Sequence, residues 1–128
     1  MFEPGEIFEF SYLWHREKMK NEESGRKDRP VCLAITTDKS LFLFPITHQP
    51  PLAGQKAIEI SEIELRRGGL TLPSWLVIDE LNYTTRDNLV DFKSIAPQGA
   101  FSEKFVRHIG ERIKALREAG RLKAVKRD

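Results

Sequence analysis

The 128-residue sequence predicts a mainly β protein, a small and strongly bent antiparallel β-barrel with an amphipathic helix near its C-terminus. Short apolar runs separated by turn residues occupy the first three quarters of the chain, as in a small barrel. The last quarter changes to a helical period. Because the sequence has no repeat and no linker-like segment, we expect residues 1–128 to form a single domain. An open sheet with a helix on one face is the alternative architecture.

The first strand is expected at residues 6–13, where Phe8, Phe10 and Tyr12 share one face at a period of two. Residues 14–28 are almost all charged or polar, so we expect a long exposed loop. Loops of this length are uncommon in small domains and are usually functional or mobile. The other strands are predicted at residues 30–37, 41–46, 57–60, 75–78 and 89–95.

Two helices are expected. Ser61 is suited to cap one or two helical turns that end at Gly68. The C-terminal helix is predicted at residues 101–119, with Ser102 as its cap and Gly120 at its end. Its apolar side chains recur every three or four residues, with charges between them, so one stripe can pack on the barrel. This stripe comprises Phe101, Phe105, Ile109, Ile113 and Leu116.

Composition excludes several classes of protein. Cys32 is the only cysteine and lies in an apolar run, so we expect a buried, inert thiol. The His, Asp and Glu residues lack the spacing of metal ligands, so neither a metal ion nor a cofactor is expected. No apolar run reaches the roughly 18–20 residues that span a bilayer, and no secretory signal is recognisable. We therefore expect a cytoplasmic protein without membrane contact.

The charge is unevenly distributed, although the formal net charge is only +2. Residues 101–128 contain nine Lys or Arg against four Asp or Glu, and residues 14–29 contain six against four. The rest of the chain is acidic. Two basic segments on an acidic body are suited to attract an anionic polymer, and a solvated helix face is an equally good explanation.

A candidate site lies around the second and third predicted strands. Arg29 directly precedes one buried strand, and Thr47 and His48 follow the next. A guanidinium can donate two parallel hydrogen bonds to a phosphate, and an imidazole titrates near neutral pH. We therefore predict these three residues as catalytic groups around a phosphodiester. The structural alternatives are an ion pair of Arg29 with Glu23 or Asp28, a turn cap at Thr47, and a backbone contact at His48.

Further candidates come from the adjacent carboxylates and the basic loop. Only one of Asp79 and Glu80 can face a groove, because successive strand residues point to opposite sides. We predict Asp79 as a general base, and a turn carboxylate is the alternative. A tryptophan at the edge of a basic loop can stack on an unpaired base. The predicted substrate-binding residues are Trp14, His15, Arg16 and Lys27.

The order of several short motifs resembles the PemK/MazF family of toxin ribonucleases, or growth inhibitors. The match extends over nearly the whole chain. Within this family, the chain is similar to an uncharacterised bacterial subgroup. Each motif is short, but the ordered set is moderately specific. The matching motifs are Pro4-Gly5-Glu6-Ile7-Phe8, Arg29-Pro30-Val31, Pro45-Ile46-Thr47, and Gly69-Leu70 followed by Ser74-Trp75.

The resemblance implies an SH3-like half-open barrel that forms a homodimer and holds single-stranded RNA in a groove. It also implies a metal-independent endoribonuclease of a type II toxin–antitoxin system, neutralised by a small antitoxin protein. In this family Arg29 and Thr47 would belong to the active site. Two positions depart from the family pattern: His48 replaces the usual serine, and Val77 stands where some members carry an arginine. The alternative is therefore a catalytically inactive PemK-like module that binds nucleic acid or a protein partner.

Overall fold

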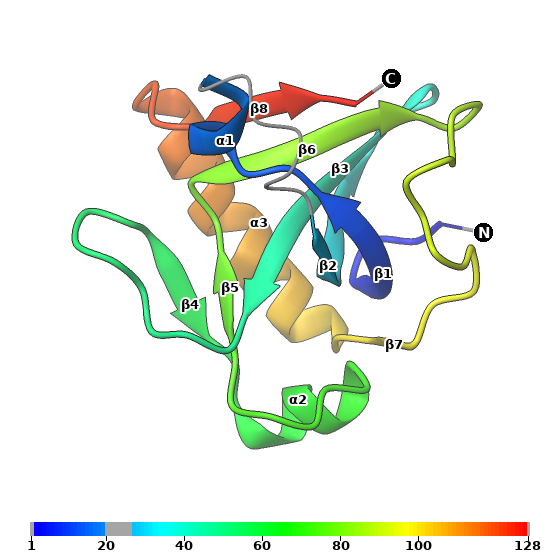
Figure 1. Ribbon diagram of the computed structural model, residues 1–128. Helices are drawn as coiled ribbons and strands as arrows, with labels where there is room; N and C mark the ends of the chain where they lie inside the picture. The colour runs from blue at the N-terminus through cyan, green and yellow to red at the C-terminus, as the bar shows by residue number, and fades with distance from the viewer. Residues whose placement is uncertain (1, 20–26, 128) are drawn as a thin grey trace.

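The computed structural model describes residues 2–19 and 27–127, which form eight strands and three helices (Figure 1). The chain is mainly β, as the sequence predicts. In chain order the elements are β1 (Glu6–Tyr12), α1 (His15–Met19), β2 (Lys27–Thr36), β3 (Ser40–Thr47), β4 (Ala57–Glu59), α2 (Glu62–Arg67), β5 (Trp75–Val77), β6 (Glu80–Thr85), β7 (Gly99–Ala100), α3 (Glu103–Glu118) and β8 (Lys123–Lys126).

The strands form one strongly curled sheet. Its main path runs β4-β5-β3-β2-β1-β7, and β6 branches from β3 to join β8. One edge of β3 pairs first with β6 and then, at its last two residues, with β5, so the sheet divides and curls there. A bulge between Leu33 and Ile35 bends β2 further. The described strands pair antiparallel except for the parallel pair β6–β8. The prediction of a half-open antiparallel barrel is confirmed.

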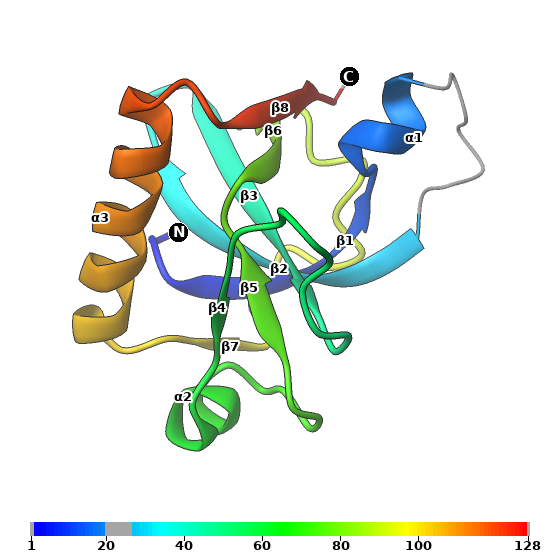
Figure 2. The ribbon, with the colours of Figure 1, turned by 90° about the vertical axis from the view of Figure 1, so that its left-hand side faces the viewer.

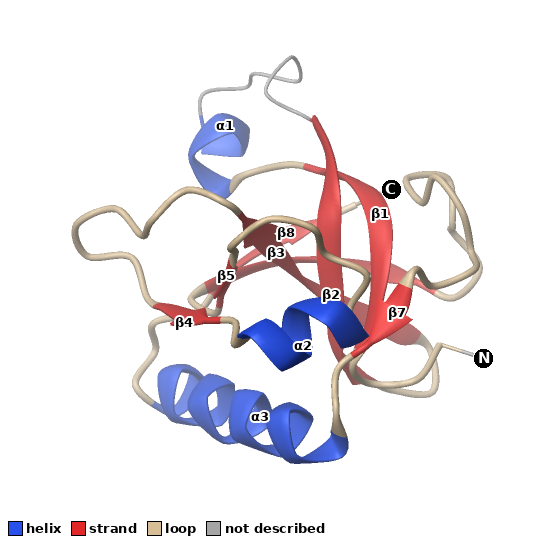
Figure 3. Ribbon diagram, turned by 90° about the horizontal axis from the view of Figure 1, so that it is seen from below, coloured by secondary structure: helices blue, strands red, loops and turns tan. Residues whose placement is uncertain are grey.

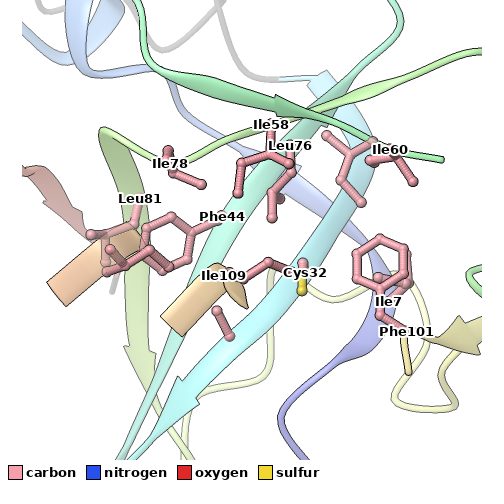
Figure 4. Close-up of a cluster of buried hydrophobic side chains, with 13 residues drawn as sticks. Ile7, Cys32, Phe44, Ile58, Ile60, Leu76, Ile78, Leu81, Phe101 and Ile109 are labelled. Carbon is pink, nitrogen blue, oxygen red and sulfur yellow. The ribbon is translucent and has the colours of Figure 1, made fainter. Parts of the chain in front are cut away.

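Both faces of the sheet are covered by apolar side chains. One cluster fills the space between the sheet and α3 and includes Cys32 and Ile109 (Figure 4). Burial raises the pKa of the Cys32 thiol to about 12, which confirms the prediction of an inert thiol. The second cluster is rich in aromatic rings and lies on the opposite face. Its buried members are Phe2, Phe8, Phe10, Tyr12, Trp14, Val31, Leu33, Leu41, Leu43, Val77 and Phe92.

The C-terminal helix forms as predicted. Ser102 Oγ accepts a hydrogen bond from the Phe105 amide at 3.2 Å and caps the first turn of α3. The helix ends before Gly120, whose φ of 69° suits glycine. Ile109 and Ile113 are buried against the sheet. α3 covers one side of the sheet, and α1 lies at the other side of the molecule (Figures 2 and 3).

The predicted strand at residues 89–95 is wrong. This segment forms turns, with a single bridge between Phe92 and Phe10. The Phe92 ring packs edge-on against Phe10 with a centroid separation of 5.0 Å, whereas Val90 and Ile95 are 74% and 51% exposed. Phe92 thus anchors a loop to the aromatic cluster. The exposed apolar residues Val90 and Ile95 made the segment resemble a strand in the sequence.

Three strands, β6, β7 and β8, are not apparent in the sequence pattern. β6 was obscured because two of its buried residues, Asn82 and Thr84, are polar. The Asn82 side-chain amide is hydrogen-bonded to the backbone of Leu13: its Oδ1 atom accepts from the Leu13 amide at 2.9 Å, and its Nδ2 atom donates to the Leu13 carbonyl at 2.8 Å. Strand β8 follows the terminal helix and returns to pair with β6, a long-range arrangement that no local pattern indicates.

The predicted exposed loop at residues 14–28 is wrong at both ends. Its first residue, Trp14, is only 8% exposed, and α1 begins immediately after it. Strand β2 already starts at Lys27. Residues 20–26 lie outside the described part of the chain. In that described part, no helix combines the length and the apolar character that crossing a bilayer requires.

Candidate functional site

A pocket of about 460 Å³ opens where the start of β2 lies beside the end of β3. The register of these two strands explains its position. Val31 pairs with Pro45 in antiparallel strands, so the same register places Arg29, two residues earlier on β2, opposite Thr47, two residues later on β3. Both side chains line the pocket. The lining residues are Trp14, Arg16, Lys27, Asp28, Arg29, Pro30, Ile46, Thr47, His48 and Gln49.

The structure brings together six of the eight predicted site residues. Three cationic side chains meet there, whereas Asp28 is the single carboxylate among the lining residues that the structure describes, and it pairs with Lys93 at 3.2 Å. The pocket is therefore a basic site suited to an anion. The six residues are Arg29, Thr47, His48, Trp14, Arg16 and Lys27.

Arg29 is the lining residue best suited to bind an anion in this pocket. Its Nε atom is buried and has no hydrogen-bond partner among the described residues. The expected alternative pairing with Asp28 does not occur, because that carboxylate bonds to Lys93; Glu23 lies outside the described residues. Burial lowers the pKa of the Arg29 guanidinium, and the nearby Arg16 lowers it further. An unpaired, partly desolvated guanidinium gains strongly from an incoming anion.

Trp14 supports the basic groups and does not offer a free face for a base. The guanidinium carbons of Arg29 and Arg16 lie over its ring, 5.0 and 5.2 Å from the centroid. The ring also packs edge-on against Tyr12 at 5.1 Å. With only 8% of the residue exposed, the Trp14 ring leaves little surface on which an RNA base could stack. Its role is to hold two cations at the pocket wall by cation–π contact.

Thr47, the last residue of β3, and His48, which follows it, also line the pocket. Thr47 Oγ1 accepts a hydrogen bond from the Gln49 amide at 3.2 Å, which is the turn-capping contact foreseen as an alternative. Because this contact uses an oxygen lone pair, the hydroxyl proton can still be donated to a bound anion. His48 is exposed at the mouth of the pocket. An imidazole there can reach both a ligand and solvent, as a proton-transfer group requires.

Asp79 lies outside the pocket, contrary to the prediction. Its Oδ2 atom accepts a hydrogen bond from the Lys56 amide at 3.0 Å and so fixes the chain before β4. This is the turn carboxylate that the sequence also allowed. The neighbouring Glu80 begins β6 and points elsewhere, because adjacent residues on an extended chain face opposite sides.

Glu80 is the functional candidate that the sequence did not single out. Its Oε2 atom accepts hydrogen bonds from the Tyr12 hydroxyl at 2.9 Å and from the His15 amide at 3.0 Å. Burial raises the pKa of Glu80, although these two hydrogen bonds oppose the shift. Burial likewise raises the pKa of Tyr12, and the Glu80 charge adds to this effect.

His15 does not line the pocket, so the prediction that it contacts substrate receives no support from the geometry. The residue begins α1, and its backbone amide bonds to Glu80. Its contribution is thus to the position of α1, which carries Arg16.

The sequence offered one signal for Glu80, which is its place beside Asp79 in an adjacent carboxylate pair. The choice between Asp79 and Glu80 depends on where β6 begins.

Comparison with known proteins does not assign the chain to a family. No family model matches the sequence, and a search of curated proteins finds no significant match.

Proposed function

We propose that this protein is a toxin-type endoribonuclease that binds single-stranded RNA in the pocket beside Arg29 and cleaves it without a metal ion. One observation carries the proposal: Arg29, whose buried Nε atom has no partner among the described residues, lines the same pocket as the Thr47 hydroxyl and the His48 imidazole. This arrangement suits a phosphodiester, whose oxygens accept hydrogen bonds and whose cleavage adds negative charge at phosphorus.

Cleavage would proceed by attack of the RNA 2′-oxygen on the adjacent phosphorus. The O2′–P bond forms and the P–O5′ bond breaks, which leaves a 2′,3′-cyclic phosphate and a 5′-hydroxyl. Arg29 stabilises the charge that develops on the phosphate oxygens, and Thr47 donates a further hydrogen bond. His48 exchanges a proton with the reacting oxygens. Arg16 and Lys27 hold neighbouring phosphates of the strand.

The proposal extends to the assembly that the PemK/MazF resemblance implies. The chain would act as a homodimer in the cytoplasm, as the toxin of a type II toxin–antitoxin pair. A small antitoxin protein would neutralise it. Neighbouring reading frames test this part: a short frame that encodes a DNA-binding half and an acidic half is the expected partner.

The decisive experiment is RNA cleavage in the presence of a chelator. Wild-type protein is expected to cut single-stranded RNA and to leave cyclic-phosphate ends. Arg29→Ala is expected to lower kcat about 100- to 1,000-fold, the usual loss for one donor to a developing oxyanion. Arg112→Ala is the matched control, because this arginine is exposed on α3 and away from the pocket. Intact RNA after prolonged incubation with the wild type would refute the proposal.

A second candidate function is a non-catalytic nucleic-acid-binding or protein-binding module. It is favoured by Val77, which stands where some relatives in the resembling family carry arginine and is fully buried in the aromatic cluster. This module would bind RNA in a salt-sensitive manner, with the slope falling by about one for each Lys or Arg removed, but would not cut it. Cyclic-phosphate ends on the product would exclude this candidate.

A further inference from the structure

Behind the pocket, one carboxylate oxygen joins three elements of the fold. Glu80 Oε2 on β6 accepts from the Tyr12 hydroxyl of β1 at 2.9 Å and from the His15 amide of α1 at 3.0 Å. These contacts connect residues that are 68 and 65 positions apart in the chain. The carboxylate does not line the pocket itself. It is thus placed to act on the site through the groups that it holds.

Those groups support both guanidinium side chains. Tyr12 is fully buried and packs edge-on against Trp14, the ring over which Arg29 and Arg16 lie. The His15 amide belongs to the first turn of α1, and Arg16 is the next residue. Loss of the Glu80 contacts would therefore release the aromatic support and the short helix at the same time.

The charge of Glu80 also acts on Arg29 without using its donors. Burial lowers the pKa of Arg29, whereas the negative field of Glu80 raises it and so favours the charged guanidinium. Within the described residues, Glu80 bonds to Tyr12 and His15, and the Arg29 Nε–H stays unpartnered. A carboxylate that bonded directly to Arg29 would compete with a phosphate. Glu80 thus compensates part of the Arg29 charge from a distance, while its own hydrogen bonds go to Tyr12 and His15.

We infer that Glu80 is a positioning residue, which acts through Tyr12 and the first turn of α1 to hold Arg29 and Arg16 over Trp14 at the pocket proposed to bind the phosphodiester. The inference rests on the proposed function for the identity of the ligand. It concerns a residue that does not touch the RNA. Misplacement of a catalytic group by about 1 Å can cost about 100-fold in rate. A residue that positions Arg29 can therefore affect the rate strongly without contacting the RNA.

The test compares Glu80→Gln and Tyr12→Phe with Glu111→Gln, a variant with the same charge change at an exposed position on α3. Glutamine keeps one carbonyl acceptor, so the variant is expected to fold. We expect kcat on a single-stranded RNA to fall about 10- to 100-fold for Glu80→Gln and to stay unchanged for Glu111→Gln. Tyr12→Phe is expected to shift kcat in the same direction.

A second measurement separates positioning from simple stabilisation. The Nε–H resonance of Arg29, assigned by its loss in Arg29→Ala, reports the guanidinium environment in nitrogen-edited NMR spectra. We expect this resonance to shift in Glu80→Gln and Tyr12→Phe but not in Glu111→Gln. A merely structural role would lower the thermal midpoint and leave the resonance of the folded protein in place.

The outcomes are distinguishable. If the wild type cuts RNA while Glu80→Gln has wild-type kcat and an unmoved Arg29 resonance, the inference is overturned and the proposed function stands. If the wild type cuts nothing, the proposed function fails. The NMR comparison and binding of a non-cleavable 2′-deoxy oligonucleotide then decide the inference: a shifted resonance with weaker binding supports it, and an unchanged resonance overturns it.

Discussion

The guanidinium carbon of Arg29 lies 5.0 Å from the centroid of the Trp14 ring, and the ring holds Arg16 at a similar distance of 5.2 Å. Two like charges near one aromatic ring repel each other, and an anion bound between or beside them offsets this repulsion. Trp14 is itself held by Tyr12 in an edge-on contact. The aromatic pair therefore keeps a cationic pair together in the absence of ligand, which prepares the pocket for a phosphate.

Replacement of Trp14 by leucine is expected to weaken binding of a 2′-deoxy oligonucleotide about 3- to 10-fold, because the cation–π support of two arginines is lost. The affinity is measured by fluorescence anisotropy at a temperature at which all variants are folded. In a double-mutant cycle with Arg29→Ala, the two losses should add only in part, because Trp14 acts partly through Arg29 and partly through Arg16. Additive losses would contradict a supporting role for the ring.

A pH dependence of stability follows from Glu80. Burial raises the pKa of this carboxyl above its unfolded value of about 4.3. Between these two values the folded protein binds more protons than the unfolded chain. The contribution of Glu80 to stability is therefore complete below about pH 4.3 and is lost as the pH rises through the folded-state value.

Glu80→Gln removes this titration. We expect the free energy of unfolding of the variant, relative to the wild type, to increase as the pH rises from 4 towards 7. Urea denaturation across this range measures the difference, and Glu111→Gln corrects for the general effect of one lost charge. A difference that is constant with pH, or that falls, would show that the carboxyl is not desolvated as the structure indicates.

The parts of the fold that the sequence predicted depend on local signals. Helix α3 was correctly placed because Ser102 caps it, Gly120 ends it and the apolar stripe between them has one period. The β2–β3 hairpin was predicted from its short polar turn. Those two strands also carry Arg29 and Thr47, so the centre of the pocket could be anticipated from neighbouring elements alone.

The parts that were missed depend on long-range pairing. Asn82 and Thr84 make β6 look polar, and the partner that allows Asn82 to be buried, Leu13, lies 69 positions away in the sequence. Without β6, nothing in the sequence could decide between Asp79 and Glu80. The burial of Trp14 was missed for the same reason, since the aromatic cluster that covers it comes from several strands.

The packing of α3 on the sheet can be tested at Ile113, which is 2% exposed. Ile113→Ala removes three methyl or methylene carbons from the cluster between the sheet and the helix and leaves a cavity. We expect the free energy of unfolding to fall by about 2–5 kcal/mol. Ile63→Ala is the control, because Ile63 on α2 is 65% exposed and its truncation should cost little. Equal losses for the two variants would refute the helix–sheet packing.

The side-chain amide of Asn82 is a buried polar group that is hydrogen-bonded through both its oxygen and its nitrogen. Asn82 Oδ1 accepts from the Leu13 amide and from an Arg127 guanidinium nitrogen, both at 2.9 Å, and its amide donates to the Leu13 carbonyl at 2.8 Å. Arg127 further forms a buried ion pair with Asp91 at 3.2 Å. Asn82, on β6, therefore connects Leu13, which directly follows β1, with Arg127 near the C-terminal end of the described residues.

Asn82→Ala would leave the Leu13 backbone groups buried without their side-chain partner. We expect the free energy of unfolding to fall by about 2–4 kcal/mol, since each buried polar group left unsatisfied costs about 1–3 kcal/mol. Asn88→Ala is the comparison, because its side chain accepts one long hydrogen bond, from Val90 at 3.4 Å, in an exposed turn. Chemical denaturation of both variants measures the difference. A loss at Asn82 no larger than that at Asn88 would mean that water replaces the missing amide, and that this end of the barrel is open to solvent.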